Sequence, residues 1–434
     1  MEQHLDMFKS FKFWRNFVGG YLAVVAGIWG LVEAYTYFQG TQLKELLGNL
    51  WLMFYGFPIP VAFVLAYLTI IDRKARLERQ RQDIARQATP QRIQEWLVNY
   101  YTSKGQSHYL YEMNTTPTTL AIPFLTKTEW VLSERMPDSL VVFPPEPTIS
   151  LVKPDPKFID QRRQLFGQEV WDDPIYCATR LTTSDIGIRV EAGYGNYFQF
   201  LTACGPLSDE VLFAVAYNRA THYRNKMTPT LDMIETFPCK AHAIGIHSLV
   251  IGKGSDGEFT TVLHRRSRKV AINTGTFTGV PTFTFQPHSG SDKHDQDITH
   301  SFLREYLEEL YDKEEFIKSE ADKSRPRVTW WYGLPEMRPV IEMMKQGEAN
   351  FQMLGLGFDP SYCDLVICVC LIIYNQPYWE KALGEMRKNW EASQRVFRQE
   401  YPLFSKEVDE LLTKRLIQPG TAYCIDRARM LLKA

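Results

Sequence analysis

Two long apolar runs stand near the beginning of the chain. The first covers residues 17–38, and the second covers residues 50–71 without a single charged side chain. Each has about the 20 residues that an α-helix needs to cross a hydrocarbon core of about 30 Å. A cleaved signal peptide would be shorter, and a buried helix of a soluble protein would carry a polar stripe. The pattern predicts a hairpin of two transmembrane helices.

The positions of lysine and arginine predict how this hairpin is oriented. Three basic residues lie within residues 1–16, only Lys44 lies between the spans, and five basic residues follow within residues 73–81. Cationic flanks stay on the cytoplasmic side of a membrane. We therefore expect a cytoplasmic N-terminus over residues 1–16, a cytoplasmic C-terminus, and almost no chain outside.

Small and ionisable residues in the first span suggest how the hairpin assembles. Gly19, Ala23 and Gly27 recur at four-residue spacing, which puts small side chains on one helix face and allows close helix packing. Glu33 is ionisable inside the span, so it is a functional candidate, although a position at the outer interface is the alternative. These four residues are the predicted membrane-assembly positions.

A helical segment and a large globular region follow the hairpin. Residues 72–88 are rich in Arg, Gln and Glu, and residues 91–101 place apolar side chains at helical spacing. We expect a helical linker over residues 72–104, with its arginines among lipid headgroups. Residues 105–434 then form the cytosolic domain.

Strand-like and helix-like runs alternate in the globular region. Residues 107–152 contain short apolar runs broken by Pro, Thr and Asn, which indicates an irregular lead-in. Helices are predicted at 194–218, 298–311, 376–401 and 403–433. Strands are predicted at 243–251, 260–263, 271–274, 281–285 and 365–374. The mixture predicts an α+β fold, in the form of an αβα sandwich with C-terminal helices.

Composition narrows the function classes. The formal net charge is -1, which argues against a protein built to coat nucleic acid, so no direct nucleic-acid partner is expected. The seven cysteines show no CxxC spacing of the kind found in zinc or redox motifs. Reduced thiols in a reducing compartment are the simplest interpretation.

Three carboxylates on the helix at residues 298–311 form the main chemical motif. Glu305, Glu308 and Glu309 occupy i, i+3 and i+4, so they share one helix face. A hard cation such as Mg²⁺ would relieve their mutual repulsion and bring substrate phosphates with it. Arg304 could orient or neutralise one of them. The alternative is an ordinary solvated acidic face.

The spacing around these residues resembles the signature of the Nudix superfamily. That signature is G-x5-E-x7-R-E-U-x-E-E-x-G-U, where U is a bulky aliphatic residue, and this chain keeps its spacing from Gly290 onward. The matching positions after Gly290 are Gln296, Arg304, Glu305, Tyr306, Leu307, Glu308, Glu309, Leu310 and Tyr311. Gln296 stands where the family has Glu, and Tyr311 with Asp312 replaces the final Gly-U. The resemblance implies a Nudix-like domain that keeps the metal-facing glutamates, while the substitutions argue against hydrolysis.

A membrane hairpin joined to such a domain looks like the two-transmembrane Nudix-like effectors of cyclic-oligonucleotide-based anti-phage signalling systems (CBASS). The resemblance implies that a cyclic nucleotide binds the cytosolic domain and that the membrane part then compromises the inner membrane, with assembly into a homo-oligomer on activation. His264, Arg265 and Arg266, together with Arg304, could meet the ligand phosphates. A solvated basic loop is the alternative for this cluster. Trp331 and Tyr332 could stack a base or simply pack in the core.

Three hypotheses remain open at this point. The first is a ligand-gated membrane effector that senses a cyclic nucleotide. The second is a membrane-anchored Nudix hydrolase of a nucleoside diphosphate derivative that uses Mg²⁺ on Glu305, Glu308 and Glu309. The third is a membrane-tethered regulator with neither activity.

Overall fold

The chain divides into two compact units, Met1–Arg81 and Gln82–Ala434. The computed structural model describes residues 58–117, 119–131, 134–135, 140–144, 152–166, 170–184, 187–226, 242–266, 275–287, 294–313, 330–386 and 399–433. The predicted first span, with its membrane-assembly residues Gly19, Ala23, Gly27 and Glu33, lies outside these ranges.

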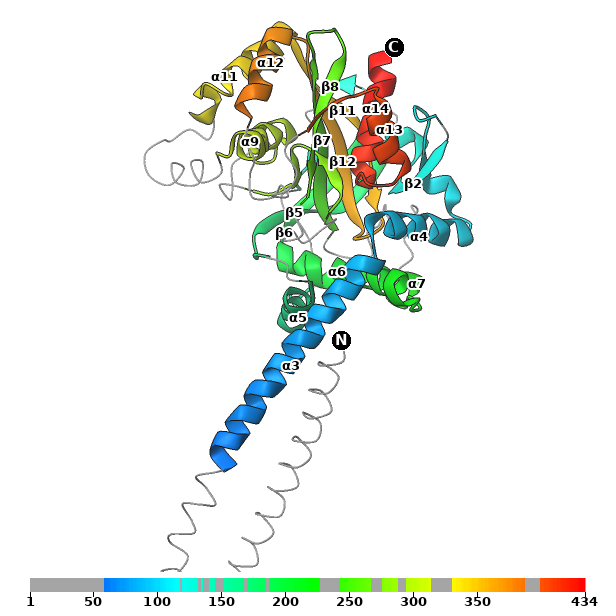
Figure 1. The fold of residues 1–434 in the computed structure, drawn as a ribbon. Coiled ribbons are helices and arrows are strands. Elements are labelled where there is room, and N and C mark those ends of the chain that lie inside the picture. The colour runs from blue at the N-terminus through cyan, green and yellow to red at the C-terminus, as the bar shows by residue number, and fades with distance from the viewer. Residues whose placement is uncertain are drawn as a thin grey trace, which may run out of the picture. The chain divides into compact units, whose positions relative to one another are not determined.

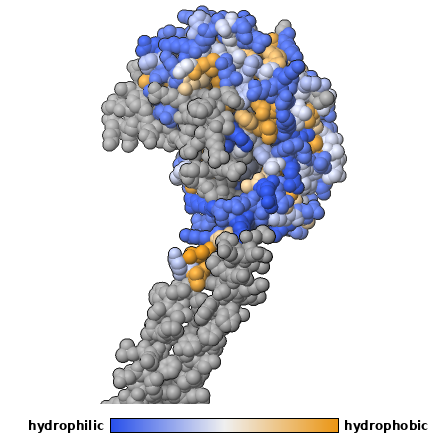
Figure 2. All heavy atoms as spheres, viewed as in Figure 1, coloured by the Kyte–Doolittle hydropathy of each residue, from blue (hydrophilic) through white to orange (hydrophobic). Residues whose placement is uncertain are grey.

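Helix α3 (Pro58–Gln87) contains the second half of the second predicted span and most of the predicted basic helix that follows. Near its start, Tyr67, Ile70 and Ile71 are 64%, 54% and 44% exposed. Figure 2 shows hydrophobic side chains where the coloured part of this helix begins. Farther along, Arg76 pairs with Asp72 at 2.9 Å on the same helix. Within the described residues, no helix is long and apolar enough to qualify as a membrane span.

A large mixed sheet forms the centre of the second unit. Its main path runs β1-β2-β11-β12-β7-β5-β6-β4. The strands are β1 (Leu110–Met113), β2 (Leu120–Leu125), β3 (Glu134–Arg135), β4 (Val141–Val142), β5 (Pro174–Ser184), β6 (Gly187–Asn196), β7 (His242–Lys253), β8 (Phe259–Arg265), β9 (Phe277–Gly279), β10 (Thr282–Thr284), β11 (Ala349–Asp359), β12 (Asp364–Ile373) and β13 (Gln399–Pro402). β7 and β12 are parallel, and β11 is antiparallel to β12. β12 is almost wholly apolar, whereas β7 includes His242, His247 and Ser248; both strands are buried along nearly their whole length, as expected of strands covered on both faces.

Helices cover both faces of this sheet, as Figure 1 shows for α9, α11 and α12 on one side and α13 and α14 on the other. The helices of this unit are α4 (Pro90–Ser103), α5 (Pro156–Phe166), α6 (Tyr197–Tyr217), α7 (Tyr223–Lys226), α9 (Ile298–Tyr311), α11 (Arg338–Gln346), α12 (Gln376–Glu385), α13 (Lys406–Thr413) and α14 (Pro419–Lys433). Alternate side chains of β12 pack on opposite faces of the sheet. Ile367 belongs to the core that includes α9, and Cys368 belongs to the core that includes α14. The predicted mixed α+β fold is confirmed.

Several predicted elements differ from the structure. The expected lead-in at residues 107–152 contains β1 and β2, which pair with each other. The helix predicted at residues 376–401 ends at Glu385, and Gln399–Pro402 is an edge strand that pairs with β8. Helical periodicity and strand pairing compete at such short segments, and long-range pairing decides the outcome.

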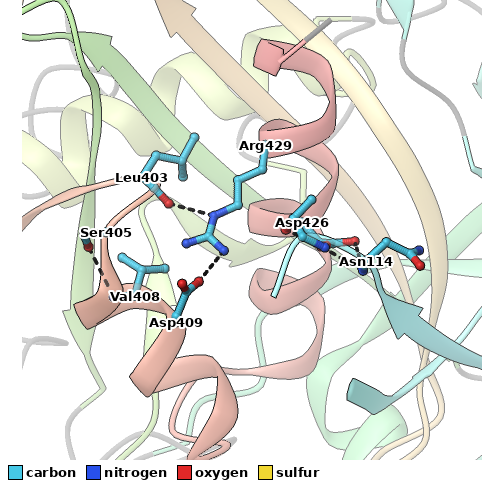
Figure 3. A network of polar contacts seen from close by, with 8 residues as sticks. Asn114, Leu403, Ser405, Val408, Asp409, Asp426 and Arg429 are labelled. Atoms are coloured by element: carbon cyan, nitrogen blue, oxygen red, sulfur yellow. Dashed lines mark hydrogen bonds and ion pairs between the residues drawn. The ribbon is translucent and has the colours of Figure 1, made fainter. Parts of the chain in front are cut away.

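Buried polar contacts attach the C-terminal helices to the sheet (Figure 3). The Asp426 carboxylate of α14 accepts hydrogen bonds from the Tyr111 hydroxyl at 2.8 Å and from the Thr115 backbone N–H at 2.8 Å. On the next turn, Arg429 donates to the Leu403 carbonyl at 2.7 Å and to Asp409 at 2.6 Å. A buried charge costs much free energy unless it is paired, so these contacts fix α14 in one position.

A close backbone approach joins α12 to β7. Trp379 of α12 is fully buried and donates its indole N–H to the Thr260 hydroxyl at 2.8 Å. Its ring lies against Gly252 so closely that a Cβ at that position would overlap it. Glycine is therefore required at Gly252 by packing.

Candidate functional site

Helix α9 carries the Nudix-like motif, and its bounds are those predicted from the sequence. Asp297 caps its N-terminus by accepting from the Thr299 N–H at 2.7 Å. Phe302 and Leu303 face the sheet and are buried. This apolar face docks α9 on the sheet, and Asp312 ends the helix in the left-handed conformation.

Arg304 forms ion pairs with two of the three motif glutamates. Its guanidinium lies 2.8 Å from Glu305 Oε1 and 2.9 Å from Glu308 Oε1. The arginine side chain is 4% exposed, and those of Glu305 and Glu308 are 9% and 11% exposed. Burial alone would lower the pKa of Arg304, but the two carboxylates outweigh this effect and the net shift is upward. The alternative of a solvated acidic face is therefore wrong.

Glu309 makes a different contact from its two neighbours. Its Oε1 accepts a hydrogen bond from the Thr282 backbone N–H of β10 at 3.0 Å, and the residue is 7% exposed. Glu305 and Glu308 thus pair with Arg304, whereas Glu309 binds the backbone of β10. Among the residues that the structure describes, no group of three or more His, Cys, Asp and Glu is arranged to hold a metal ion. Mg²⁺ binding by Glu305, Glu308 and Glu309 stays a prediction.

The turn before α9 connects the motif to the edge of the sheet. Gln296, which stands at the loop-acid position of the family signature, donates its amide N–H to the Tyr194 hydroxyl at 3.2 Å. Asp295 is 2% exposed and precedes it. Burial, followed by Tyr194 and Asp295, raises the pKa of Tyr176, so this phenol stays protonated. Side chains of β5 and β6 therefore lie beside the turn that precedes the motif helix.

A histidine at the first turn of α9 contacts the aromatic turn at Trp330–Gly333. His300 Nδ1 lies 2.8 Å from the Tyr332 hydroxyl, and its ring centroid is 4.9 Å from that of Trp331. Burial, and then His294, lowers the pKa of His300 to about 4, so it is neutral at physiological pH. Trp331 is 2% exposed and belongs to the core, which supports the packing interpretation for this residue.

Three of the residues predicted to bind phosphate, His264, Arg265 and Arg266, lie at the end of β8 and immediately beyond it, and the fourth, Arg304, lies on α9. His264 is 5% exposed, whereas Arg265 is exposed and donates its Nε–H to the Gly275 carbonyl at 3.1 Å. Successive side chains of a strand point to opposite faces, so His264 and Arg265 do not share one surface. Arg266 is partly buried, and its backbone N–H donates to the Thr276 carbonyl at 2.9 Å. Phosphate binding by these residues stays a prediction.

Sequence reasoning missed the aromatic residues beside the motif. Tyr176 and Tyr194 are cross-strand partners on β5 and β6, and Phe143 and Phe285 pack on Tyr176 with ring centroids 4.6 and 4.7 Å away. The two tyrosines share one face because they lie directly opposite each other. The available signal was the alternation of polar and apolar residues in β6, but the helix predicted at residues 194–218 included Tyr194, whereas α6 begins at Tyr197.

Comparisons with known proteins show only limited similarity between this chain and other proteins. No family model matches the chain, and no curated protein matches it. A Nudix hydrolase from Alicyclobacillus acidocaldarius is similar in structure at 12% identity and a TM-score of 0.28, over 44% of this chain and 96% of that chain. The Nudix hydrolase RenU from M. smegmatis is similar at 10% identity and a TM-score of 0.21, over 44% of this chain and 85% of that chain. Both likenesses involve less than half of the chain.

Proposed function

We propose that the chain is a membrane-anchored sensor whose Nudix-like domain binds a cyclic nucleotide without hydrolysing it. The arrangement of the motif carboxylates is the main support. Arg304 is paired with Glu305 and Glu308, and Glu309 holds the backbone of β10. Carboxylates engaged in this way stabilise the fold around α9, whereas metal-dependent hydrolysis would require them to turn toward a shared cation.

Gln296, in the turn before α9, supports the same conclusion. The family signature has an acid at the position of Gln296, which can supply a ligand or a base in hydrolysis. The amide of Gln296 cannot take up a proton in this role, and it donates to Tyr194 instead. It can still recognise a bound ligand through hydrogen bonds.

The response to the bound cyclic nucleotide is proposed to occur at the inner membrane. The apolar runs at residues 17–38 and 50–71, and the basic residues that follow them, support a multi-pass anchor with both termini in the cytoplasm. Tyr67, Ile70 and Ile71 of α3 are exposed and lie on one helix face, which suits a surface placed against lipid. In this proposal the ligand-bound chains form homo-oligomers, and their hairpins disrupt the membrane as an anti-phage CBASS effector would.

The test uses full-length protein in detergent, incubated with Mg²⁺ and cyclic di-AMP, cyclic di-UMP or ADP-ribose. Bound and cleaved species are separated by chromatography and identified by mass spectrometry. Intact cyclic nucleotide retained by the protein, together with nucleotide-dependent dye leakage from liposomes that carry it, is the expected result. Binding of neither cyclic nucleotide would refute the sensor.

A second candidate is a Mg²⁺-dependent hydrolase of a nucleoside diphosphate derivative. The conserved spacing of Arg304, Glu305, Glu308 and Glu309 within the signature favours it. Under this alternative, ADP-ribose is cleaved only with Mg²⁺, and the double variant Glu308→Gln/Glu309→Gln loses cleavage. Glu342→Gln, an exposed glutamate on α11, is the matched control. Such cleavage would replace the sensor with an enzyme that uses its helices as an anchor.

A further inference from the structure

Four aromatic rings form a continuous group beside the first turn of α9, and we name this group the aromatic platform: Phe143, Tyr176, Tyr194 and Phe285. The ring centroids of Tyr176 and Tyr194 are 5.5 Å apart, and Phe143 lies 6.2 Å from Tyr194. Tyr176 is 1% exposed and Phe285 is fully buried. These two rings form the floor of the platform.

Tyr194 is the exposed member of the platform. It is 39% exposed although it belongs to a buried aromatic group, and Phe143 beside it is half-buried. The rings below it and the hydrogen bond from Gln296 hold it in place. A partly exposed aromatic ring that is held by neighbouring rings and a hydrogen bond is suited to stacking, because little side-chain entropy is lost when a flat ligand binds.

Hydrogen bonds connect the platform to the charged motif. Gln296 contacts Tyr194 and stands in the turn directly before α9. The Ser301 hydroxyl of α9 donates to the Asp295 carbonyl in the same turn at 3.3 Å. Arg304 lies one turn farther along α9. A ligand seated on Tyr194 would therefore have its polar groups near the N-terminal end of the motif helix.

We propose that the aromatic platform is the nucleobase subsite, with the base stacked on Tyr194 against Phe143 and its edge recognised by Gln296. This inference rests on the proposed function and names the ligand class as a purine nucleotide. An amide side chain has two N–H donors and an oxygen acceptor, and the bond to Tyr194 uses one donor. The remaining donor and acceptor match the edge of adenine. The larger purine ring also covers more of Tyr194 than a pyrimidine does.

Two probes with the same cyclic phosphate backbone separate base recognition from phosphate recognition. The affinity of the full-length protein for cyclic di-AMP and for cyclic di-UMP is measured by isothermal titration calorimetry. Wild type is expected to bind cyclic di-AMP about tenfold more tightly, because the larger purine covers more of Tyr194 and its edge pairs with Gln296, and tenfold in affinity is about 1.4 kcal/mol. Tyr194→Ala removes this preference, and Tyr194→Phe keeps it within about threefold, because the ring remains.

Tyr374→Ala is the matched control, since Tyr374 is also 39% exposed and has an aromatic neighbour in Phe259. It is expected to leave both affinities unchanged. If wild type binds both nucleotides equally, or if Tyr194→Ala binds cyclic di-AMP as wild type does, the platform is not a base subsite and the sensor stands. If neither nucleotide binds, the sensor fails and this inference falls with it.

Discussion

Replacing Arg304 with methionine tests the buried charge arrangement at the centre of the motif. Methionine keeps most of the aliphatic volume and removes the guanidinium that pairs with both Glu305 and Glu308. The two carboxylates then share one helix face without a cation. They must either take up protons or repel each other in a site with little water.

The size of the effect follows from how deeply these groups are buried. All three side chains are at most 11% exposed, so solvent screens the charges poorly. Removing one partner from a buried ion pair costs about 3–5 kcal/mol. We therefore expect Arg304→Met to lower the free energy of unfolding by about 4 kcal/mol. Adding Glu308→Gln to that variant removes one unpaired charge, so it should restore about 1–2 kcal/mol.

Urea unfolding of the full-length protein in detergent, followed by tryptophan fluorescence, measures both effects. Arg338→Met is the control, because Arg338 is exposed and its hydrogen bond to the Gly333 carbonyl lies on the surface. This control should change the free energy by less than about 0.5 kcal/mol. A loss below about 1 kcal/mol for Arg304→Met, or no recovery in the double variant, would show that the ion pairs do not form as described.

Three further predictions concern stability. Burial raises the pKa of Asp209 from 3.8 to about 6, although Arg162 opposes this shift. The folded protein therefore takes up this proton first, and acidification from pH 7 to 5 should favour wild type over Asp209→Asn by about 1 kcal/mol in urea titrations. Gly252→Ala should cost about 1–3 kcal/mol because its Cβ overlaps Trp379, whereas Gly384→Ala in open space on α12 should be neutral or stabilising in thermal melts. Asp426→Ala should cost about 3 kcal/mol by leaving its buried donors without an acceptor, and an unchanged melting temperature would contradict this.

The elements that were predictable from the sequence are those with strong local patterns. The sequence of α9 places about two apolar residues in each turn on one face of the helix, and its predicted bounds match the structure. β12 is a continuous apolar run and β7 is mostly apolar, a composition that indicates strands buried on both faces. β11 was missed because Gly355 and Gly357 interrupt its apolar run, and its place in the sheet is fixed by pairing with β12.

The candidate site was predictable only in part. The spacing of Arg304 and Glu308 at i and i+4 is a local signal, and the structure contains that pair. The contact of Glu309 with Thr282 needs the packing of α9 on β10, which no local pattern gives. Tyr194 joins the site because β6 pairs with β5 far from α9 in the sequence, so only the tertiary fold brings it beside Gln296.

Helix α14 covers one face of the sheet, and this has a consequence for how the protein folds during synthesis. Asp426 bonds to Thr115 across 311 positions of sequence, and Cys424 donates to the His247 carbonyl across 177. Contacts this distant slow folding, because a long loop must close before they form. During synthesis the N-terminal segment therefore emerges long before the domain can complete its core. The ribosome must synthesise the chain through α14 before the second face of the sheet is covered, and until then that face is open to chaperones and to aggregation.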